Sequence, residues 1–407
     1  MSGPHRPVAS AGGAAPVPSP FAGLLQSMSA ALTRGLARIT GGAVFPYQSA
    51  VIRIGFSLTW LAFLLREWVN RDELYGPDSP WSWQMARQLN AANHAFTVLM
   101  WSDSPRWFEV VYAAAIAAAV MLLVGWRTRT ASLLFMVGVL ALQNRSVFEG
   151  DGGDNVIHVM AVYLVFTRCG QVWSLDARRA RRIPSDGRDV VGIVMWALFA
   201  AVLTLVTVLD KLSAGWALVF WGALAGQAVW WLVRRYAPGE PRSVVEMTGN
   251  VVHAGAMLVI AVQVCFIYAT AGWYKIQGPQ WENGTALYYA LHLNDFTPWP
   301  GLSHALAGSG LLVMLITYGT VIFESAFPFA LINRHVKNVL LPMMMCGHVG
   351  IGFIFGLPFF ALGMITADAL FLPTSFLRWV GDRIGRTLQA ARASGRATCA
   401  EQTPPTP

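Results

Sequence analysis

The amino-acid sequence predicts an all-α integral membrane protein with about ten transmembrane helices, because apolar runs near the length of a bilayer-crossing helix recur along the chain. Of the 407 residues, 55% are hydrophobic and 12% are charged, whereas about a quarter of the residues in a soluble domain are charged. The 17 tryptophans fit the same class, since indole rings favour the interface between hydrocarbon and water. The predicted fold is therefore a polytopic helical bundle.

Charge and cysteine usage exclude several other classes. The formal charge of +8 at pH 7 comes mostly from arginines spread over short loops between apolar runs, which favours membrane topology over a nucleic-acid partner. Motifs of nucleotide-binding proteins, hydrolases and zinc proteins are absent from the sequence. We therefore predict no metal site, and the spacing of the cysteines favours no disulfide: Cys169, Cys265, Cys346 and Cys399.

The two ends of the chain are predicted to lie outside the transmembrane domain. Residues 1–20 are rich in Pro, Gly, Ala and Ser and lack the apolar core of a signal peptide, so we expect them to be disordered. Residues 21–42 carry apolar side chains at helical spacing, which predicts an amphipathic helix on the membrane surface. Residues 376–407 form a basic tail that is expected to be disordered at its end.

The transmembrane domain is predicted to cover residues 47–375. The residues between the first two spans, 70–106, are too rich in aromatic side chains for a simple linker. Residues 190–233 form an additional helix pair, and Gly356 to Pro358 divide the last apolar run in two. The predicted spans are residues 51–68, 108–124, 131–142, 155–166, 190–209, 214–233, 251–274 and 302–331, and two within 339–372.

The distribution of basic residues predicts the orientation. With ten spans both termini lie on one side, and a cytoplasmic N-terminus places most of the 29 lysines and arginines in cytoplasmic loops. The expected location is the cell membrane, with both termini in the cytoplasm. Lys275 then faces the exterior, as do most of the acidic residues.

Lys275 is the first candidate site residue. It is one of only three lysines, with Lys211 and Lys337, and it stands where an apolar helix ends and a polar, aromatic-rich segment begins. A desolvated lysine can lose its proton and act as a base. The alternative is that Lys275 only anchors the helix at the interface by extending its ammonium into water.

A second candidate cluster consists of Asp154 and His158 with the preceding acidic residues Glu149 and Asp151. Asp154 and His158 are four residues apart, so a helix places them on one face. The carboxylate could orient the imidazole for proton transfer or share a metal with it. The alternative is a solvated loop in which Asp154 caps a helix N-terminus.

Two ionisable residues fall inside predicted spans, where they are costly unless they face a partner or a cavity. His348 is either a site residue or a neutral, hydrogen-bonded core residue. Glu324 is either a site residue or a structural partner of Arg334 or Lys337, and Asp368 is treated in the same way. The aromatic residues after Lys275 are either interface anchors or members of its site: Trp281, Tyr288, Tyr289 and His292.

Six segments in order resemble the HTTM family, the membrane domain shared by vitamin K-dependent γ-carboxylases and their bacterial relatives. The resemblance covers about Val51 to Pro373 and implies an HTTM-type bundle, to which residues 190–233 are an addition. The matching segments are GWRTRTASLL, QNRSVFEGDGGDN, VWSLDARR, AGWYKIQGPQWENGTALYYAL, FESAFPF and GHVGIGFIFGLPFFALGMITADALFLP.

The resemblance implies roles for several residues. Lys275, followed by Trp281, is similar to the carboxylase lysine that deprotonates reduced vitamin K, and His348 to a histidine of a carboxylase segment. The asparagine-histidine pair of the carboxylases is not reproduced, because Val156 follows Asn155 and His158 comes two positions late. The implied cofactor is reduced vitamin K or menaquinone. The candidate residues for binding substrate or cofactor are Trp281, Tyr288, Asn155 and Glu324.

Three functions follow as hypotheses. The first is a quinone-linked membrane enzyme with an outward-facing site that uses Lys275 as base, together with His348, His158 and Asp154. The second is a non-catalytic membrane factor for maturation or export of a secreted peptide, which the missing asparagine-histidine pair and the absence of a large substrate-binding domain favour. A transporter is the third, although the sequence shows no clear inverted repeat.

Overall fold

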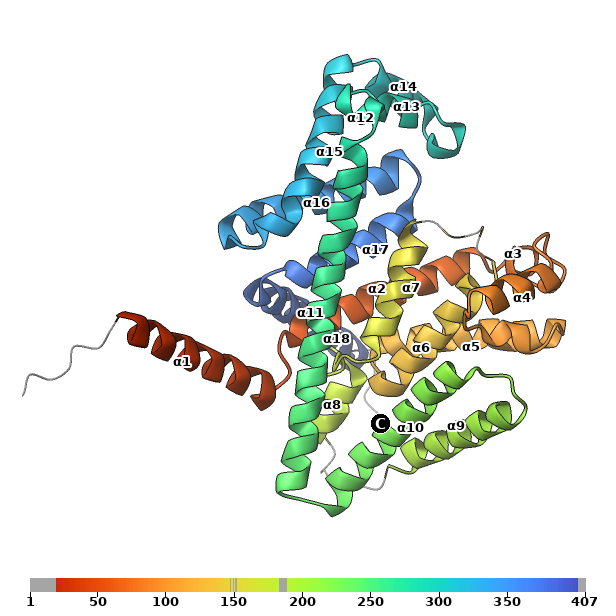
Figure 1. Ribbon diagram of the computed structural model, residues 1–407, viewed down its shortest axis with the longest axis vertical. Helices are drawn as coiled ribbons and strands as arrows, with labels where there is room; N and C mark the ends of the chain where they lie inside the picture. The colour runs from red at the N-terminus through yellow and green to blue at the C-terminus, as the bar shows by residue number, and fades with distance from the viewer. Residues whose placement is uncertain (1–19, 147, 149, 151, 183–188, 402–407) are drawn as a thin grey trace, which may run out of the picture.

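The computed structural model describes residues 20–146, 148, 150, 152–182 and 189–401, and every regular element in these ranges is helical. In Figure 1 the long helix α11 (Glu240–Ile276) runs along much of the longest axis of the molecule, and the other helices pack beside it. The all-α prediction is confirmed for the described residues. The disorder predicted for residues 1–20 and for the end of the tail falls almost entirely outside them.

The N-terminal half contains the elements that precede α11 along the chain. Their order and bounds are α1 (Pro20–Gly41), α2 (Pro46–Arg66), α3 (Arg71–Tyr75), α4 (Trp83–Ala92), η1 (Val98–Trp101), α5 (Pro105–Val124), α6 (Thr128–Gln143), α7 (Gly152–Leu164), α8 (Leu175–Arg182), α9 (Val190–Val208) and α10 (Ala214–Tyr236). Helix α1 extends away from the bundle in Figure 1 and contacts α11.

The C-terminal half follows α11. Its elements are α12 (Pro279–Glu282), α13 (Ala286–Ala290), η2 (Asn294–Phe296), α14 (Pro300–Ala307), α15 (Gly310–Ala330), α16 (Arg334–Ile354), α17 (Pro358–Asp368), η3 (Ala369–Phe371) and α18 (Thr374–Glu401). The predicted break before Pro358 separates α16 from α17. The tail that was predicted as a basic extension is helical as far as Glu401.

Seven of the described helices are long and apolar enough to cross a membrane: α2, α5, α9, α10, α11, α15 and α16. The number becomes eight if the bent pair formed by residues 358–371 and 374–387 is one span. The other predicted spans correspond to α6, α7 and α17, with 16, 13 and 11 residues, which are shorter than the roughly 20 residues that cross a bilayer. Apolar composition alone did not reveal where these helices end.

The added pair α9 and α10 lies on the outside of the bundle. Only 6% of the apolar window of each helix is buried inside the molecule, against 61% for α2. Their apolar side chains therefore face the surroundings, as expected for helices in contact with lipid.

A buried arginine on α2 joins three segments of the N-terminal half. Arg53 is fully buried, and its guanidinium donates hydrogen bonds to the carbonyl oxygens of Leu122 (2.5 Å), Leu123 (2.8 Å) and Trp173 (2.7 Å). The last carbonyls of a helix have no partner within that helix, so Arg53 satisfies those at the end of α5. The predicted first span, residues 51–68, includes Arg53 near the end assigned to the cytoplasmic side, and the structure places its side chain in the protein interior.

Replacement of Arg53 by glutamine is expected to destabilise the protein by about 3 kcal/mol, since it removes the charged donor of the hydrogen bonds to the carbonyls of Leu123 and Trp173 and one of the two donors to that of Leu122. The measurement is thermal unfolding of purified protein in detergent. Arg66→Gln is the matched control, because the Arg66 side chain is 63% exposed; it lies 3.3 Å from Glu67 and 5.4 Å from the centroid of the Phe359 ring. Equal stability losses in the two variants would contradict the structural role of Arg53.

The segment between α2 and α5 is ordered by another buried arginine. Arg145 donates hydrogen bonds to the carbonyl oxygens of Trp81 (2.8 Å) and Gly76 (2.6 Å) and to the Ser79 hydroxyl (2.8 Å). Helices α3, α4 and η1 lie in this segment. The prediction that it is more than a simple linker is therefore confirmed.

An ion pair fixes the start of α9. Asp189 caps α9 by accepting a hydrogen bond from the backbone N–H of Gly192, and Arg127 donates to both of its carboxylate oxygens at 2.6 and 2.8 Å. The Arg127 guanidinium holds the pKa of the Asp189 carboxyl well below its usual range, against the opposing effect of partial burial. The added helix pair is thus tied to the start of α6.

The contribution of this pair to stability should depend on pH. It is fully present above the pKa of an unfolded aspartate, about 3.9, and is lost as the pH falls through the lower pKa of the folded state. Because the Asp189 side chain is 37% exposed, we expect about 1 kcal/mol or less. Melting temperatures of the parent and Asp189→Asn should differ at neutral pH and converge progressively below about pH 4. A difference in melting temperature that stays constant with pH would contradict a pH-dependent contribution of the Arg127–Asp189 pair. Asp210→Asn, at an exposed position, serves as the control.

Candidate functional site

Lys275 and Glu324 form an ion pair between two antiparallel helices that are long and apolar enough to cross a membrane. Lys275 lies in the last turn of α11, Glu324 lies on α15, and Nζ is 2.5 Å from Oε2. Their side chains are 20% and 13% exposed. Gly272, one turn before Lys275, permits the close approach of the helices, since a Cβ there would lie 2.6 Å from the Ser325 hydroxyl oxygen.

Trp281 completes the surroundings of this lysine. The chain turns back after α11, and α12 brings the Trp281 ring centroid to 5.2 Å from Lys275 Nζ. An ammonium near an indole ring is attracted to its electron-rich face. The structure therefore brings together three of the predicted site residues: Lys275, Glu324 and Trp281.

The alternative partners predicted for Glu324 are wrong. Lys337 donates instead to the carbonyl oxygen of Phe371 (2.6 Å), and Arg334 contacts the neighbouring His335 (3.4 Å). Both residues begin α16, beyond the end of α15. Glu324 comes earlier on α15 and faces α11, so proximity along the chain was a poor guide to its partner.

A second polar group lies deeper, at Tyr268, His348 and Asp368. The Tyr268 hydroxyl is 2.8 Å from His348 Nε2 and donates a hydrogen bond to Asp368 Oδ1 at 2.7 Å. All three residues are buried, with at most 5% of each exposed. The hydroxyl thus connects α11, α16 and α17 within the helical bundle.

The hydrogen bonds of this group constrain its protons. Tyr268 has one hydroxyl proton, and if it goes to Asp368, the imidazole of His348 must donate to Tyr268 from Nε2. His348 Nδ1 is then an acceptor. Neither that nitrogen nor Asp368 Oδ2 has a hydrogen-bond partner among the described residues. Two buried acceptors are therefore available to a hydrogen-bond donor.

The two polar groups lie along one face of α11. Tyr268, Gly272 and Lys275 follow at spacings of four and three residues, which places them on the same helix face. The rise from Tyr268 to Lys275 is about 10 Å. The buried hydroxyl of Ser325, adjacent to Glu324 and against Gly272, has no hydrogen-bond partner among the described residues. Together these side chains form what we call the α11 polar row: Tyr268, Lys275, Glu324, Ser325, His348 and Asp368.

Asp154, Asn155 and His158 face a different pocket. They line a cavity of about 190 Å³ with Gln143, Asn144 and Trp60 among its other walls. Asp154 lies in the first turn of α7, which begins at Gly152, so it is not the helix N-cap. As predicted, Asp154 and His158 share a helix face. Glu149 and Asp151 lie outside the described residues.

An aromatic ring on α17 approaches both regions. The Phe360 ring is 5.8 Å from the His348 ring, centroid to centroid, and 3.2 Å from the position of a Cβ built on Gly152 at the start of α7. His158 and Asp154 therefore belong to a separate pocket, whereas His348 belongs to the α11 polar row. A single site shared by Lys275, His348 and His158 is not formed by direct contacts.

Tyr288 lies in a third place. It is on α13, where it stacks on His292 with ring centroids 4.1 Å apart and contacts Tyr289 at 5.9 Å. Its side chain is exposed, and its ring contacts do not include Lys275. The structure thus places Tyr288 in an aromatic surface cluster.

Tyr268 is the main residue that sequence reasoning missed. Its signal was available, because it precedes Lys275 by seven residues, which is two helical turns. Asp368, for which the sequence left a site role and a structural role open, is fully buried and hydrogen-bonded to Tyr268. Among the described residues, no three His, Cys, Asp or Glu side chains are grouped so that they could hold a metal ion.

Comparison with known proteins does not assign a family. The chain has no significant match to a protein-family model, a curated protein or a solved structure. Functional inference therefore depends on the residues and their geometry.

Proposed function

We propose that the protein is a multi-pass enzyme of the cell membrane that transfers a proton from a lipid-soluble quinol to the α11 polar row. The proposal rests on a series of titratable side chains within the helical bundle. The series extends from Lys275 and Glu324 to Tyr268, His348 and Asp368. Ionisable residues inside a bundle of membrane helices typically mark proton or substrate pathways. The similarity of Lys275 and Trp281 to the carboxylase pattern supports a reduced quinone as the substrate class.

The Lys275–Glu324 pair supports a balanced proton transfer. Transfer of the shared proton to Glu324 leaves a neutral Lys275 amine and a carboxylic acid, a form that a low-dielectric environment favours over two separated charges. The amine then takes the proton of the quinol hydroxyl. The products are a quinol anion and a Lys275 ammonium, whose charge stabilises that anion. Dissolved dioxygen is the oxidant: it takes two electrons from the quinol anion and, with the anion's remaining proton and the proton held by Lys275, gives the quinone and hydrogen peroxide. The Trp281 ring supplies an apolar surface beside the reacting amine.

The second polar group supports binding of the same substrate. A quinol has two hydroxyl groups, and each can donate one hydrogen bond. His348 Nδ1 and Asp368 Oδ2 are buried acceptors of the kind such a hydroxyl requires. In this proposal they orient the quinol, while Lys275 removes its proton.

The proposal is tested with purified protein in lipid nanodiscs supplied with reduced menaquinone and dissolved dioxygen. Consumption of the quinol is followed by ultraviolet absorbance for the parent, Lys275→Ala and Lys211→Ala. We expect Lys275→Ala to lower the rate by about a hundredfold or more, the range for loss of a general base. Lys211 is exposed in the loop between α9 and α10 and should be replaceable. Failure of the parent to bind or consume reduced menaquinone or vitamin K would refute the proposal.

The second candidate is a non-catalytic membrane factor that assists maturation or export of a secreted peptide. Its support is that Lys275 is held by Glu324, so the pair also has the geometry of a structural link between α11 and α15. In this case Lys275→Ala would affect folding alone. Normal processing of secreted peptides in a deletion strain would argue against this function.

A further inference from the structure

Six arginines line a cleft far from Lys275. The cleft has a volume of about 820 Å³ and lies between α6, α8 and α10. Glu246 on α11 pairs with two of these arginines and is 29 residues from Lys275, a helical rise of about 44 Å. This exceeds the thickness of a bilayer's hydrocarbon core, about 30 Å, so the two sites belong to opposite ends of the bundle. The arginines are Arg127, Arg129, Arg168, Arg179, Arg181 and Arg234.

The described carboxylates neutralise only part of this charge. Asp189 pairs with Arg127 and Arg179, and Glu246 pairs with Arg168 and Arg234. Asp176 is engaged by the backbone N–H groups of Arg127 and Thr128 and by the Thr128 hydroxyl. Six guanidinium groups against these three carboxylates leave three positive charges, because 6 − 3 = 3. The cleft is therefore complementary to an anion.

Arg129 is the guanidinium best placed to bind that anion. Its Cζ lies 3.7 Å from the centroid of the Trp230 ring, and Arg168 and Arg234 approach the same ring at 5.3 and 5.9 Å. Within the described part of the chain, Arg129 has neither a carboxylate partner nor a side-chain hydrogen bond. A guanidinium has five N–H donors in a planar arrangement that matches phosphate oxygens. The Trp230 ring thus brings the guanidinium groups of Arg129, Arg168 and Arg234 together.

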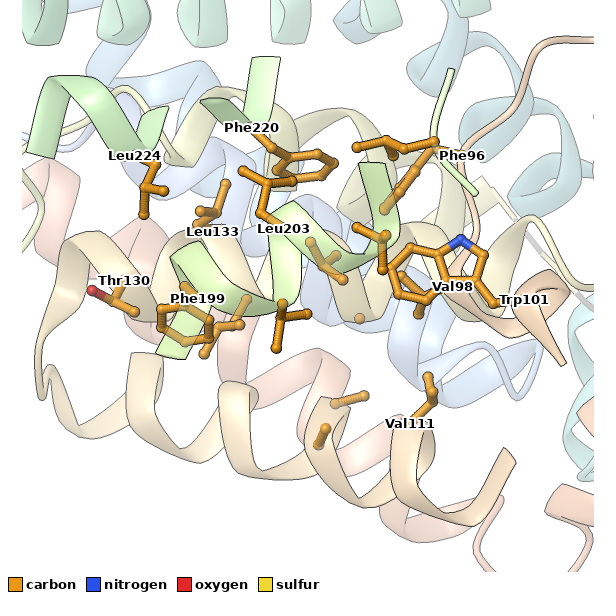
Figure 2. A pocket seen from close by; sticks show the side chains of 18 of the residues that line it. Phe96, Val98, Trp101, Val111, Thr130, Leu133, Phe199, Leu203, Phe220 and Leu224 are labelled. Carbon is orange, nitrogen blue, oxygen red and sulfur yellow. The ribbon is translucent and has the colours of Figure 1, made fainter. Parts of the chain in front are cut away.

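An apolar cavity adjoins the cleft. It has a volume of about 470 Å³ and lies between α5 and α6 on one side and α9 and α10 on the other. Figure 2 shows Phe199, Leu203 and Phe220 around it, with Thr130 near one end and Trp101 near the other. Thr130 and Gln227 line both the cavity and the arginine cleft. The basic cleft and the apolar cavity therefore share part of their walls.

We propose that the arginine cleft and the adjoining apolar cavity together bind a phospholipid with an anionic head group. The phosphate lies at Arg129 and an acyl chain lies in the apolar cavity. Basic pockets between membrane helices are suited to anionic lipid head groups. The apolar cavity distinguishes a lipid from free phosphate, which would leave it unused. The positive-inside rule accounts for arginines in this region but not for their arrangement around Trp230 in a cleft that adjoins an apolar cavity. In this proposal the added pair α9 and α10 forms the outer wall of the lipid site.

The test measures lipid retention by delipidated, full-length protein in detergent, using native mass spectrometry with added phosphatidylglycerol or phosphatidylcholine. We expect phosphatidylglycerol to bind more tightly, and Arg129→Gln to weaken its binding by about tenfold, as for loss of a charge-assisted hydrogen bond. Arg129→Lys should retain part of the affinity because it keeps the charge but not the planar donors. Arg87→Gln is the matched control, since Arg87 also stacks on an indole, that of Trp83 at 5.4 Å.

The role of the apolar cavity in binding the acyl chain is tested separately. Leu203→Trp, or Leu203→Phe if the larger side chain prevents folding, should lower phosphatidylglycerol affinity by filling the cavity. Glycerol 3-phosphate and inorganic phosphate, as head-group probes without a tail, should compete weakly. Equal binding of the two lipids, equal effects of Arg129→Gln and Arg87→Gln, or competition by inorganic phosphate at the lipid's own concentration would each overturn the proposal. Size-exclusion elution and melting temperature establish that each variant compared is folded.

Discussion

Lys275→Met and Glu324→Leu are each expected to destabilise the protein by about 3–5 kcal/mol, because removal of one partner leaves the other as an uncompensated charge between membrane helices. The 2.5 Å contact and the low exposure of both side chains support an effect of this size. The double variant should recover most of the loss, since two apolar side chains of similar length can fill the same space. The pair is thus expected to be replaceable for folding.

Unfolding in detergent, followed by circular dichroism during heating, measures all three variants. The control is a double-mutant cycle of Arg71→Met and Glu109→Leu. This pair has a comparable N–O distance of 2.7 Å, but the Glu109 side chain is 43% exposed. The control cycle should show a coupling of about 1 kcal/mol or less. A similarly small coupling for Lys275 and Glu324 would show that the pair is solvated and would contradict its assignment to the buried row.

Tyr268→Phe is expected to lower quinol turnover by about a hundredfold and stability by about 1–3 kcal/mol. The substitution keeps the ring against Phe327, whose centroid is 4.5 Å away, and removes only the hydroxyl between His348 and Asp368. His348 and Asp368 then lose their shared hydrogen-bond partner while remaining buried. We therefore expect the substrate to be oriented less well and the local packing to be less stable.

Tyr288→Phe is the matched control for this substitution. Tyr288 is 45% exposed on α13, so loss of its hydroxyl should leave both turnover and melting temperature near the parent values. Turnover by Tyr268→Phe at the parent rate, in protein of normal stability, would remove Tyr268, His348 and Asp368 from the reaction and leave them as a structural cluster.

The membrane class and the main spans could be predicted from the sequence because they depend on apolar content and run length, which are local properties. The lengths of α6, α7 and α17 could not, since their ends are set by glycines and polar residues whose effect depends on tertiary contacts. Gly363 illustrates this, as it packs near the backbone of Gly153 on α7, more than 200 residues away along the chain. Composition contains no information about such contacts.

The candidate site shows the same division. Lys275, His348 and Glu324 were identifiable because ionisable residues in apolar runs are costly and therefore conspicuous. Their partners were not, because the Lys275–Glu324 and Tyr268–His348 pairs join residues 49 and 80 positions apart. Only the packing of α11 against α15 and α16 determines these pairs. His158 was grouped with Lys275 through the family resemblance, and the position of Phe360 separates them.

The arginines illustrate how one composition can support several structures. Their abundance in loops predicted an orientation, yet Arg53 and Arg145 are buried donors to backbone carbonyls. Arg129 instead lies over Trp230. A rule that counts charges by loop cannot distinguish these environments, because burial depends on which helix packs against each arginine.

The most direct test of the proposed proton transfer is menaquinol turnover by the Lys275→Met/Glu324→Leu double variant in nanodiscs, compared with the parent at equal amounts of folded protein. If the pair transfers the proton, the double variant should be as stable as the parent within about 1 kcal/mol and slower by about a hundredfold or more. Turnover at the parent rate by the stable double variant would contradict a role for Lys275 and Glu324 in the reaction.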